Sequence, residues 1–303
     1  METATLPETT RTWTLRLPRG RRLELGKRPR VMGILNLTPD SFSDGGLWTD
    51  PERAVEQGLR MLAAGADAID LGAESTRPGG GVYGGGAATV SAEAEAARLL
   101  PVLAALRLAT GAPLSVDTRK GEVARQALGA GADLINDVSA LADPALGRAV
   151  AEAGCPLVLM HSRGDLATMQ QEIRFDDLIG EVRAELAQAM ERAVAVGVEE
   201  SQIVLDPGIG FGKTWRQNLT LLARLGELAA LGRPLLVGAS RKSFIARAAA
   251  RAGLPEPPPD RRLAGSLAAV ARAAELPAAI VRVHDVEETV QFLDVWYAAA
   301  EAG

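Results

Sequence analysis

The fold is decided by the stretch Val31-Met32-Gly33-Ile34-Leu35-Asn36-Leu37-Thr38-Pro39-Asp40. Its first residues are apolar without alternation, which predicts a strand buried on both faces, as in a parallel sheet covered by helices. A doubly wound open sheet would usually carry a glycine fingerprint directly after its first strand. Here the strand runs into Asn36 and Pro39 without those glycines. The pattern therefore favours a closed (β/α)8 barrel, the TIM-barrel class of α/β proteins.

Seven more apolar runs follow, which together with the first suit a barrel of eight strands. Amphipathic stretches separate them, and several end in Ala-Gly-Ala-Asp or Val-Gly-Val, where glycine supplies the positive φ of a helix C-cap. The predicted strands are 31–35, 68–71, 114–116, 134–135, 156–160, 203–205, 234–237 and 279–283. The predicted helices include 51–64, 92–109, 177–196 and 217–231.

The segment before this regular pattern has a different character. Two short alternating stretches flank Pro18-Arg19-Gly20, so residues 12–30 are predicted to form a β-hairpin. No linker of domain-boundary length follows, and residues 255–259 are expected to form a stiff local loop. Residues 1–303 are therefore expected to be a single domain, with 1–30 as its lead segment.

Composition excludes several classes of protein. The chain has 303 residues, 47% of them hydrophobic, and a formal charge of -5, which argues against a nucleic-acid partner because phosphate contacts need a basic face. No apolar run approaches the length of a membrane span, and the first residues lack the apolar core of a signal peptide. We therefore expect a cytoplasmic protein. The single cysteine, Cys155, is predicted to be a small buried side chain.

Polar or ionisable side chains stand at the C-terminal edge of nearly every predicted strand. In a barrel these edges meet at one mouth, where the active sites of this fold are built. A lone Asp or Asn at a strand end often only binds nearby backbone, and we assign Asp70 and Asp137 to that structural role. The full set is Asn36, Asp70, Asp117, Asn136, Asp137, His161, Asp206, Ser240, Lys242, Arg282 and His284.

Other common sites do not fit the sequence. The run from Asp206 to Thr214 contains Gly-Lys-Thr, but the first glycine that a P-loop requires falls on Pro207, and the Rossmann spacing fails too. We expect instead a loop whose glycines let the backbone pass beside a flat ligand. No His/Cys cluster has zinc spacing, and Ser240 lacks the nucleophile-elbow context of a hydrolase.

Several motifs together resemble the dihydropteroate synthase family, in register over roughly residues 30–300. The two longest are Gly33-Ile34-Leu35-Asn36-Leu37-Thr38-Pro39-Asp40-Ser41-Phe42-Ser43-Asp44-Gly45-Gly46 and Glu74-Ser75-Thr76-Arg77-Pro78-Gly79. The others are Ser115-Val116-Asp117-Thr118, Leu205-Asp206-Pro207-Gly208, Phe211-Gly212-Lys213, Ser240-Arg241-Lys242-Ser243 and Arg282-Val283-His284-Asp285-Val286. The resemblance implies a transferase that joins (7,8-dihydropterin-6-yl)methyl diphosphate to p-aminobenzoate.

The resemblance also implies a role for each residue of the motifs. The carboxylates of Asp117 and Asp206 suit the adjacent N–H donors of a pterin, because a carboxylate accepts such donors in pairs. Asp44, Arg77 and Lys242 would be the catalytic residues, with Asp44 stabilising a pterin cation and Phe42 helping to close the site. The implied pterin-binding residues are Asp117, Asn136, Met160, Asp206, Phe211 and Lys242. The implied diphosphate-binding residues are Asn36, Arg77, Arg282 and His284, and the implied p-aminobenzoate-binding residues are Thr76, Arg77, Pro78, Phe211 and Ser240.

The resemblance implies magnesium as cofactor, with Asn36 as its protein ligand, because Mg²⁺ keeps most of its waters and often leans on substrate phosphate. Relatives are usually homodimers, so a homodimer is expected here. We expect loops 38–50 and 76–89 to be mobile and to order over substrates. This chain departs from the family pattern in extra residues at 80–88, in Leu166 and in Ser266, and we assign His161 no direct role.

Two alternatives share the pterin constellation. A methyltransferase barrel that presents methyltetrahydrofolate to a corrinoid would bind pterin but has no use for Arg77, Arg282 and His284. A catalytically silent pterin-binding subunit would not need Asn36 and Asp44. The presence of all five residues favours the synthase.

Overall fold

Eight parallel strands close into a barrel in the order β10-β3-β4-β5-β6-β7-β8-β9. The computed structural model describes residues 12–37, 51–74, 90–163, 173–250 and 255–302. The strands are β3 (Arg30–Asn36), β4 (Ala68–Gly72), β5 (Leu114–Asp117), β6 (Leu134–Asp137), β7 (Leu157–Met160), β8 (Ile203–Asp206), β9 (Leu235–Val237) and β10 (Ala279–Val283). The predicted TIM barrel is confirmed, and each predicted apolar run overlaps one of its strands. That the whole chain is one domain stays a prediction.

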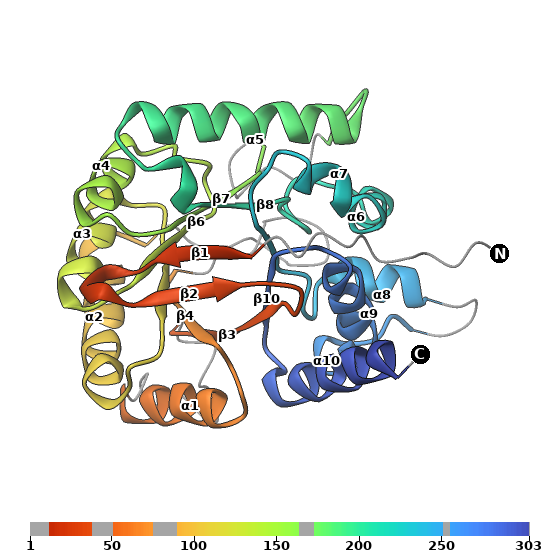
Figure 1. Cartoon of the computed structure of the whole chain (residues 1–303), viewed down its shortest axis with the longest axis horizontal. Helices are drawn as coiled ribbons and strands as arrows, with labels where there is room; N and C mark the ends of the chain where they lie inside the picture. The colour runs from red at the N-terminus through yellow and green to blue at the C-terminus, as the bar shows by residue number, and fades with distance from the viewer. Residues whose placement is uncertain (1–11, 38–50, 75–89, 164–172, 251–254, 303) are drawn as a thin grey trace.

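The helices lie outside the barrel, as Figure 1 shows for α1 and α5 on opposite sides of it. They are α1 (Pro51–Ala63), α2 (Ala92–Ala109), α3 (Gly121–Ala130), α4 (Pro144–Ala153), α5 (Leu178–Ala195), α6 (Trp215–Ala223), α7 (Leu225–Ala229), α8 (Ser243–Ala249), α9 (Leu263–Ala274) and α10 (Val286–Glu301). No helix in the described part of the chain has both the length and the apolar composition that a membrane crossing requires.

One predicted helix is wrong. The segment 217–231 is not continuous, because α6 ends at Ala223 and Arg224, whose φ and ψ of -118° and 25° are not helical, separates it from α7. The break lets Leu225 and Leu228 of α7 reach the core, where both are buried. The start also lies earlier than predicted, because Thr214 and Gln217 form a capping box around Trp215.

The predicted glycine caps are confirmed. Gly65, Gly131 and Gly197 have φ values of 97°, 116° and 100°, and each lies in a turn between a helix and the next strand. A residue with a Cβ atom is strained at such angles, so glycine is needed where the chain reverses.

The N-terminal hairpin is also confirmed, and it covers one end of the barrel. It consists of β1 (Trp13–Arg16) and β2 (Arg22–Leu25), which pair antiparallel. Its leucines pack against side chains near the strand starts, including Met32 and Leu134. In Figure 1 the hairpin is the red ribbon that crosses the barrel strands. The hairpin therefore closes the N-terminal end and leaves the C-terminal end as the mouth.

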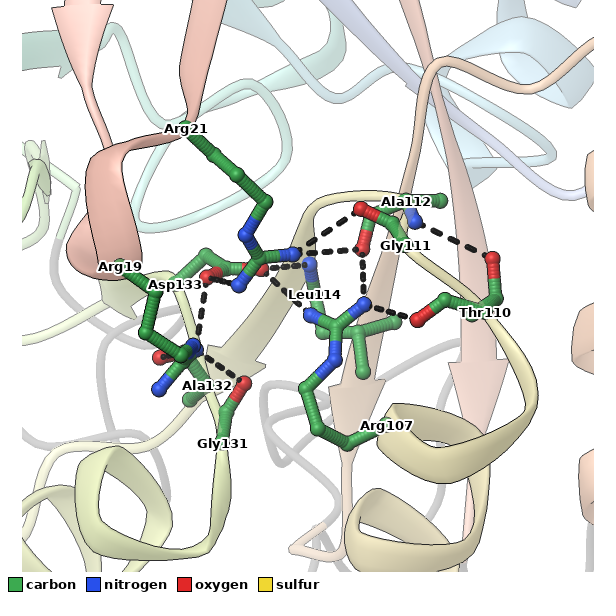
Figure 2. Close-up of polar contacts among 10 residues, drawn as sticks. All are labelled: Arg19, Arg21, Arg107, Thr110, Gly111, Ala112, Leu114, Gly131, Ala132 and Asp133. Carbon is green, nitrogen blue, oxygen red and sulfur yellow. Dashed lines mark hydrogen bonds and ion pairs between the residues drawn. The ribbon is translucent and has the colours of Figure 1, made fainter.

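Three arginines bind the carboxylate of Asp133 beside this hairpin, as Figure 2 shows. Arg19 Nη2 and Arg107 Nη1 lie 2.8 and 2.9 Å from its two oxygens, and Arg21 binds it too. Asp133 also accepts the backbone N–H of Leu114 at 3.0 Å. We call these three arginines and Asp133 the arginine clasp. It joins the hairpin turn to α2 and to the start of β6.

Candidate active site

The predicted polar residues gather at the C-terminal end of the barrel. Asn36, Asp117 and Asp206 are the last residues of β3, β5 and β8. His161 and His284 directly follow β7 and β10. Because all eight strands run in the same direction, these side chains share one rim although they are far apart in the chain.

A buried ion-pair cluster occupies this mouth. Arg282 Nε donates to Asp70 Oδ2 at 2.6 Å, and its Nη2 donates to Asp117 Oδ2 at 2.9 Å. Asn136 Nδ2 donates to the same Asp70 oxygen at 3.0 Å. Asp70 lies in the middle of β4 and holds two site side chains, so the prediction that it only supports loops or turns is wrong. The reason is that this fully buried carboxylate binds Arg282 and Asn136, which are remote in the chain, rather than nearby backbone.

Three oxygens of the cluster have no protein partner in the described part of the chain. They are Asp70 Oδ1, Asp117 Oδ1 and Asn136 Oδ1, and all three are shielded from solvent. Burial, together with the neighbouring Asp70 charge, raises the pKa of Asp117 to about 7, although Arg282 opposes the shift. Buried acceptors without a donor are costly, so these atoms are where a ligand with several N–H groups would gain most.

Asp206 and Lys242 form the second part of the mouth. Asp206 Oδ1 accepts the backbone N–H of Gly208 at 2.7 Å, and Lys242 Nζ donates to the carbonyl of Ile209. Burial raises the pKa of Asp206, and the Lys242 charge opposes that rise. Burial lowers the pKa of Lys242 to about 8. The two groups therefore stabilise each other's charged forms in a dry site.

The loop after β8 is as crowded as its glycines suggested. Gly208 and Gly210 have φ values of 67° and 87°. A Cβ atom on Gly208 would lie 1.9 Å from the carbonyl oxygen of His161, and one on Gly210 would lie 2.8 Å from Cδ of Lys242. The close approach in this structure is to His161 and Lys242, and the predicted approach to a flat ligand stays a prediction.

Apolar side chains complete this part of the mouth. Phe211 forms a small buried cluster with Met160 and Val138. The ammonium of Lys242 lies 4.3 Å from the centre of the Phe211 ring, a cation–π distance. Phe211 and Met160 are thus packed beside the predicted pterin-binding lysine.

Asn36 and His284 line a hollow of about 550 Å³ between the rim and α1. Arg53, Arg60 and Arg241 line it too, and they outnumber its one carboxylate, Glu56, which pairs with Arg60. His284 is held by Ser240, whose Oγ lies 3.1 Å from His284 Nδ1 and accepts the His284 backbone N–H at 3.2 Å. This hollow is suited to an anion more than to an apolar group.

Asp137 has the structural role that the sequence predicts. Its Oδ1 accepts the backbone N–H and hydroxyl of Ser139 at 2.8 and 2.6 Å, and its Oδ2 accepts the N–H of Leu141 at 2.6 Å. These bonds fold the loop that follows β6. Asp137 therefore supports a loop, as expected.

Glu74 was not singled out on its own by the sequence. One of its oxygens accepts the backbone N–H of Val90 at 3.2 Å, while the other accepts from Lys120 Nζ at 2.9 Å. Arg119 binds the same carboxylate, and Lys120 also binds the buried Glu95. Despite its burial, the pKa of Glu74 is lowered by these hydrogen bonds. Glu74 therefore joins the two ends of the segment 75–89, which carries three expected site residues.

Several expected site residues lie outside the described residues. These are Phe42, Asp44, Thr76, Arg77 and Pro78, together with the loops 38–50 and 76–89, the extra segment 80–88 and Leu166. Their roles stay predictions.

Lys213 is a residue whose importance the sequence only hinted at. The chain has four lysines among its 33 basic residues, so each one is informative. Lys213 is buried beside Gly208, Phe211 and His161. His161 is buried too and lies beside Lys213, and that it has no direct role stays a prediction.

Comparison with known proteins decides which family has this site. The family model described as pterin binding enzyme matches residues 32–284. Dihydropteroate synthase of Synechocystis sp. is 48% identical over 281 residues, which are 92% of this chain and 93% of that protein. The chain belongs to the dihydropteroate synthase family. It is therefore an enzyme, a transferase of that family.

Solved dihydropteroate synthases have the same fold. The Xanthomonas albilineans dihydropteroate synthase with 4-aminobenzoic acid has a TM-score of 0.85 and 45% identity, covering 96% of this chain and 99% of that one. The enzyme from the same organism in complex with 7,8-dihydropteroate has a TM-score of 0.81 and 42% identity, covering 95% and 98%. The match to the pterin binding enzyme family alone leaves open the methyltransferase barrel and the catalytically silent pterin-binding subunit. The similarity to these dihydropteroate synthases favours a synthase over both.

Proposed function

We propose that this chain condenses (7,8-dihydropterin-6-yl)methyl diphosphate with p-aminobenzoate, giving 7,8-dihydropteroate and pyrophosphate for folate biosynthesis. The observation that carries the proposal is the set of buried acceptors at the mouth, where Asp117 Oδ1 and Asn136 Oδ1 have no partner among the described residues. A pterin presents adjacent N–H donors of the kind that such acceptors bind. Family membership gives the same reaction.

The pterin ring would lie between the two halves of the mouth. Asp117 and Asp206 accept its N–H donors, and Asn136 offers an acceptor while its amide nitrogen stays on Asp70. Lys242 donates to the ring carbonyl and a ring nitrogen, exchanging its bond to Ile209 for bonds to substrate. Met160 and Phe211 contact the ring face.

The diphosphate would lie in the hollow lined by Asn36 and His284. Arg282 uses only its Nε and Nη2 groups toward Asp70 and Asp117, and a guanidinium has five N–H donors in all, so others can reach a phosphate oxygen. Arg77 is proposed as a further cation there. The negative charge of the diphosphate would then be neutralised at the place where this group leaves as pyrophosphate.

Magnesium fits this hollow through Asn36. Within the described residues no group of three or more His, Cys, Asp or Glu side chains is placed to hold a metal. These residues therefore do not form a metal site from protein ligands alone. One amide oxygen beside a diphosphate suits Mg²⁺, which takes most of its ligands from water and phosphate. Bound there, the ion would neutralise charge on the leaving group.

The reaction would need no covalent intermediate with the protein. The bond between the pterin methylene carbon and the diphosphate oxygen breaks first, and its electron pair leaves with pyrophosphate. The amine nitrogen of p-aminobenzoate then attacks the resulting cation, forms the new C–N bond and loses a proton. We propose Asp44 as the group that stabilises the cation, and Thr76, Arg77, Pro78, Phe211 and Ser240 as the p-aminobenzoate pocket. Catalysis would then rest on orientation and electrostatic stabilisation.

An assay of the purified protein tests this function. With Mg²⁺ and both substrates, we expect dihydropteroate and pyrophosphate in equal amounts, measured by chromatography and by phosphate release after pyrophosphatase. Asp206→Ala and Lys242→Ala are expected to abolish pterin binding, followed by calorimetry. A wild-type protein that forms no dihydropteroate would reject the proposal.

We also propose, as the resemblance implies, that the chain is a single domain that acts as a homodimer in the cytoplasm. Light scattering of the purified protein would measure its mass in solution, and a monomer would contradict the dimer.

A further inference from the structure

Lys213 has all three donors of its ammonium group engaged inside the protein. Nζ donates to the carbonyls of Gly208 and Phe211 at 3.0 and 2.9 Å, and it lies 2.9 Å from Nδ1 of His161. The residue is only 3% exposed. Lys213 thus ties two points of the loop after β8 to a residue after β7.

Burying the ammonium group of Lys213 costs free energy, which indicates that this group has a role. Burial lowers the pKa of Lys213 to about 7, and the charge of Asp206 is the largest influence that opposes the shift. The three hydrogen-bond partners of the ammonium are all neutral groups rather than carboxylates. An apolar side chain would avoid the desolvation cost, so packing alone does not account for a lysine here.

The two carbonyls that Lys213 binds belong to residues with direct links to the mouth. Gly208 donates its N–H to Asp206, the carboxylate proposed to bind pterin. Phe211 places its ring against Lys242 and Met160. A movement of either carbonyl would therefore move an acceptor or an apolar contact of the pterin subsite.

His161 and Glu185 hold the other side of the ammonium. An ammonium group has only donors, so Nδ1 of His161 accepts and the ring proton is on Nε2. That Nε2 lies 3.0 Å from a carboxylate oxygen of Glu185 in α5. Burial, together with the nearby Lys213 charge, lowers the pKa of His161 to about 4, so the ring is neutral at pH 7.

We infer that Lys213, held by His161, is a positioning residue for the pterin subsite: it fixes the loop of residues 207–212 and supplies a positive charge that favours the Asp206 carboxylate. This inference rests on the proposed function. Its effect on Asp206 adds to that of Lys242, which contacts the same loop at Ile209 and Gly210. The charged groups that influence Lys213 and Asp206 from the surrounding elements are Arg163, Glu185, Lys242 and Arg282.

The test compares Lys213→Met with the wild type. Methionine keeps an unbranched side chain, one atom shorter, but removes the charge and leaves three acceptors without a donor. The probe is 6-hydroxymethyl-7,8-dihydropterin, titrated by calorimetry between about pH 5.5 and about pH 8.5. We expect affinity at neutral pH to fall about tenfold or more, because small displacements of binding groups are costly. Titration of Asp117 near pH 7 contributes to the loss of affinity at acid pH in both proteins. The part of that loss that is due to Asp206 is expected to begin at higher pH in Lys213→Met, because Asp206 has lost a neighbouring cation.

Lys27→Met is the matched control. Lys27 is exposed beside the hairpin, at the other end of the barrel, and its loss is expected to change neither affinity nor pH profile. The acid limb is the part of the pH profile in which affinity falls as the pH is lowered. A folded Lys213→Met protein with wild-type affinity, or with reduced affinity and an unmoved acid limb, would overturn the inference. A general loss of stability would not move that limb.

His161→Leu keeps the inference testable if Lys213→Met does not fold. Leucine fills the buried space, removes one acceptor of Lys213 and leaves its charge in place. We expect pterin affinity to fall severalfold while the acid limb stays where it is in the wild type, and wild-type affinity would overturn the role of His161. Failure of the wild-type synthase assay rejects the proposed function itself, whereas an active wild type with unaffected variants rejects only this inference.

Discussion

Asp117 is the residue at the mouth of the barrel whose charge state matters most for the proposed pterin binding. It shares the guanidinium of Arg282 with Asp70, so two buried carboxylates have one cation between them. Burial raises the pKa of Asp117 to about 7, and the cation shared with Asp70 does not offset this rise. The value is well above the usual range of an aspartate. A ligand that donates hydrogen bonds to this carboxylate favours its ionised form.

Pterin affinity is therefore expected to depend on pH through Asp117. Below about pH 7 the group is protonated in the free protein, and pterin binding must then release a proton. We expect wild-type affinity to weaken about tenfold between about pH 8 and about pH 6, measured by calorimetry in buffers of different ionisation enthalpy. Asp117→Asn is expected to bind weakly and with much less dependence on pH.

Asp137→Asn is the control for this prediction. Asp137 is also buried, and burial raises its pKa as well, but its oxygens fold a loop. Its replacement is expected to leave the pH dependence of pterin binding in place. The same pH slope in Asp117→Asn as in the wild type would show that another group is responsible.

At the scale of elements, the sequence predicts what depends on local pattern. The strands were found because each is a short apolar run, and the positions of Asn36, Asp117 and Asp206 at strand ends followed directly. The break between α6 and α7 was missed because it depends on where Leu225 and Leu228 meet the core.

The contacts of Asp70 and Lys213 were missed for a related reason. Both side chains meet partners that are remote in the chain, since Arg282 is 212 residues from Asp70 and His161 is 52 residues from Lys213. Nothing in the local pattern of β4 or of the glycine loop shows which side chains lie opposite. Such pairs become visible only when the barrel is closed.

The turn between β9 and α8 shows how one element supports another. Arg241 has a φ of 59°, which is strained for a residue with a Cβ atom, and it lies between Ser240 and Lys242. Its N–H donates to Oγ of Ser266 in α9 at 3.0 Å. Arg262 Nη1 donates to its carbonyl at 2.9 Å. The start of α9 therefore holds the turn that presents two site residues.

Substitutions of Ser266 test this support. Ser266→Ala removes the acceptor for the Arg241 N–H, and we expect it to lower the free energy of unfolding by about 1 kcal/mol and to weaken pterin binding. Ser266→Thr keeps the hydroxyl and adds a methyl group beside a small cavity lined by Val237, Ala269 and Val270. It is expected to raise the free energy of unfolding by about 0.5 to 1 kcal/mol. Urea unfolding measures both, and an equal effect of the two changes would contradict this account.

At the scale of the whole molecule, the two ends of the barrel have separate tasks. The side chains proposed to bind substrates lie at the C-terminal end, whereas the N-terminal end is closed by the hairpin and its leucines. Two aspartates in matching Ala-Gly-Ala-Asp turns hold this closed end. Asp67 accepts the N–H of Val31 at 2.8 Å and pairs with Arg30, and Asp133 accepts the N–H of Leu114 and pairs with three arginines.

The arginine clasp predicts a large effect of a single charge at this end. Asp133 is fully buried, so Asp133→Asn leaves three guanidinium groups around an amide with one acceptor oxygen. Removing one partner of a buried ion pair typically costs about 3 to 5 kcal/mol. Because the carbonyl oxygen of the new amide still accepts, we expect a loss at the low end of this range, about 3 kcal/mol in the free energy of unfolding, measured in urea.

Asp67→Asn provides the matched comparison, because it makes the same substitution in the same kind of turn. Its side chain is 19% exposed and pairs with one arginine, so the expected loss is about 1 kcal/mol. Hydrogen exchange should show faster exchange across β1 and β2 in Asp133→Asn, since the clasp joins the hairpin turn to the barrel. The rate of dihydropteroate formation by the folded variant should equal that of the wild type, because the chemistry is at the other end. Equal losses in the two variants would show that three arginines hold the hairpin no better than one.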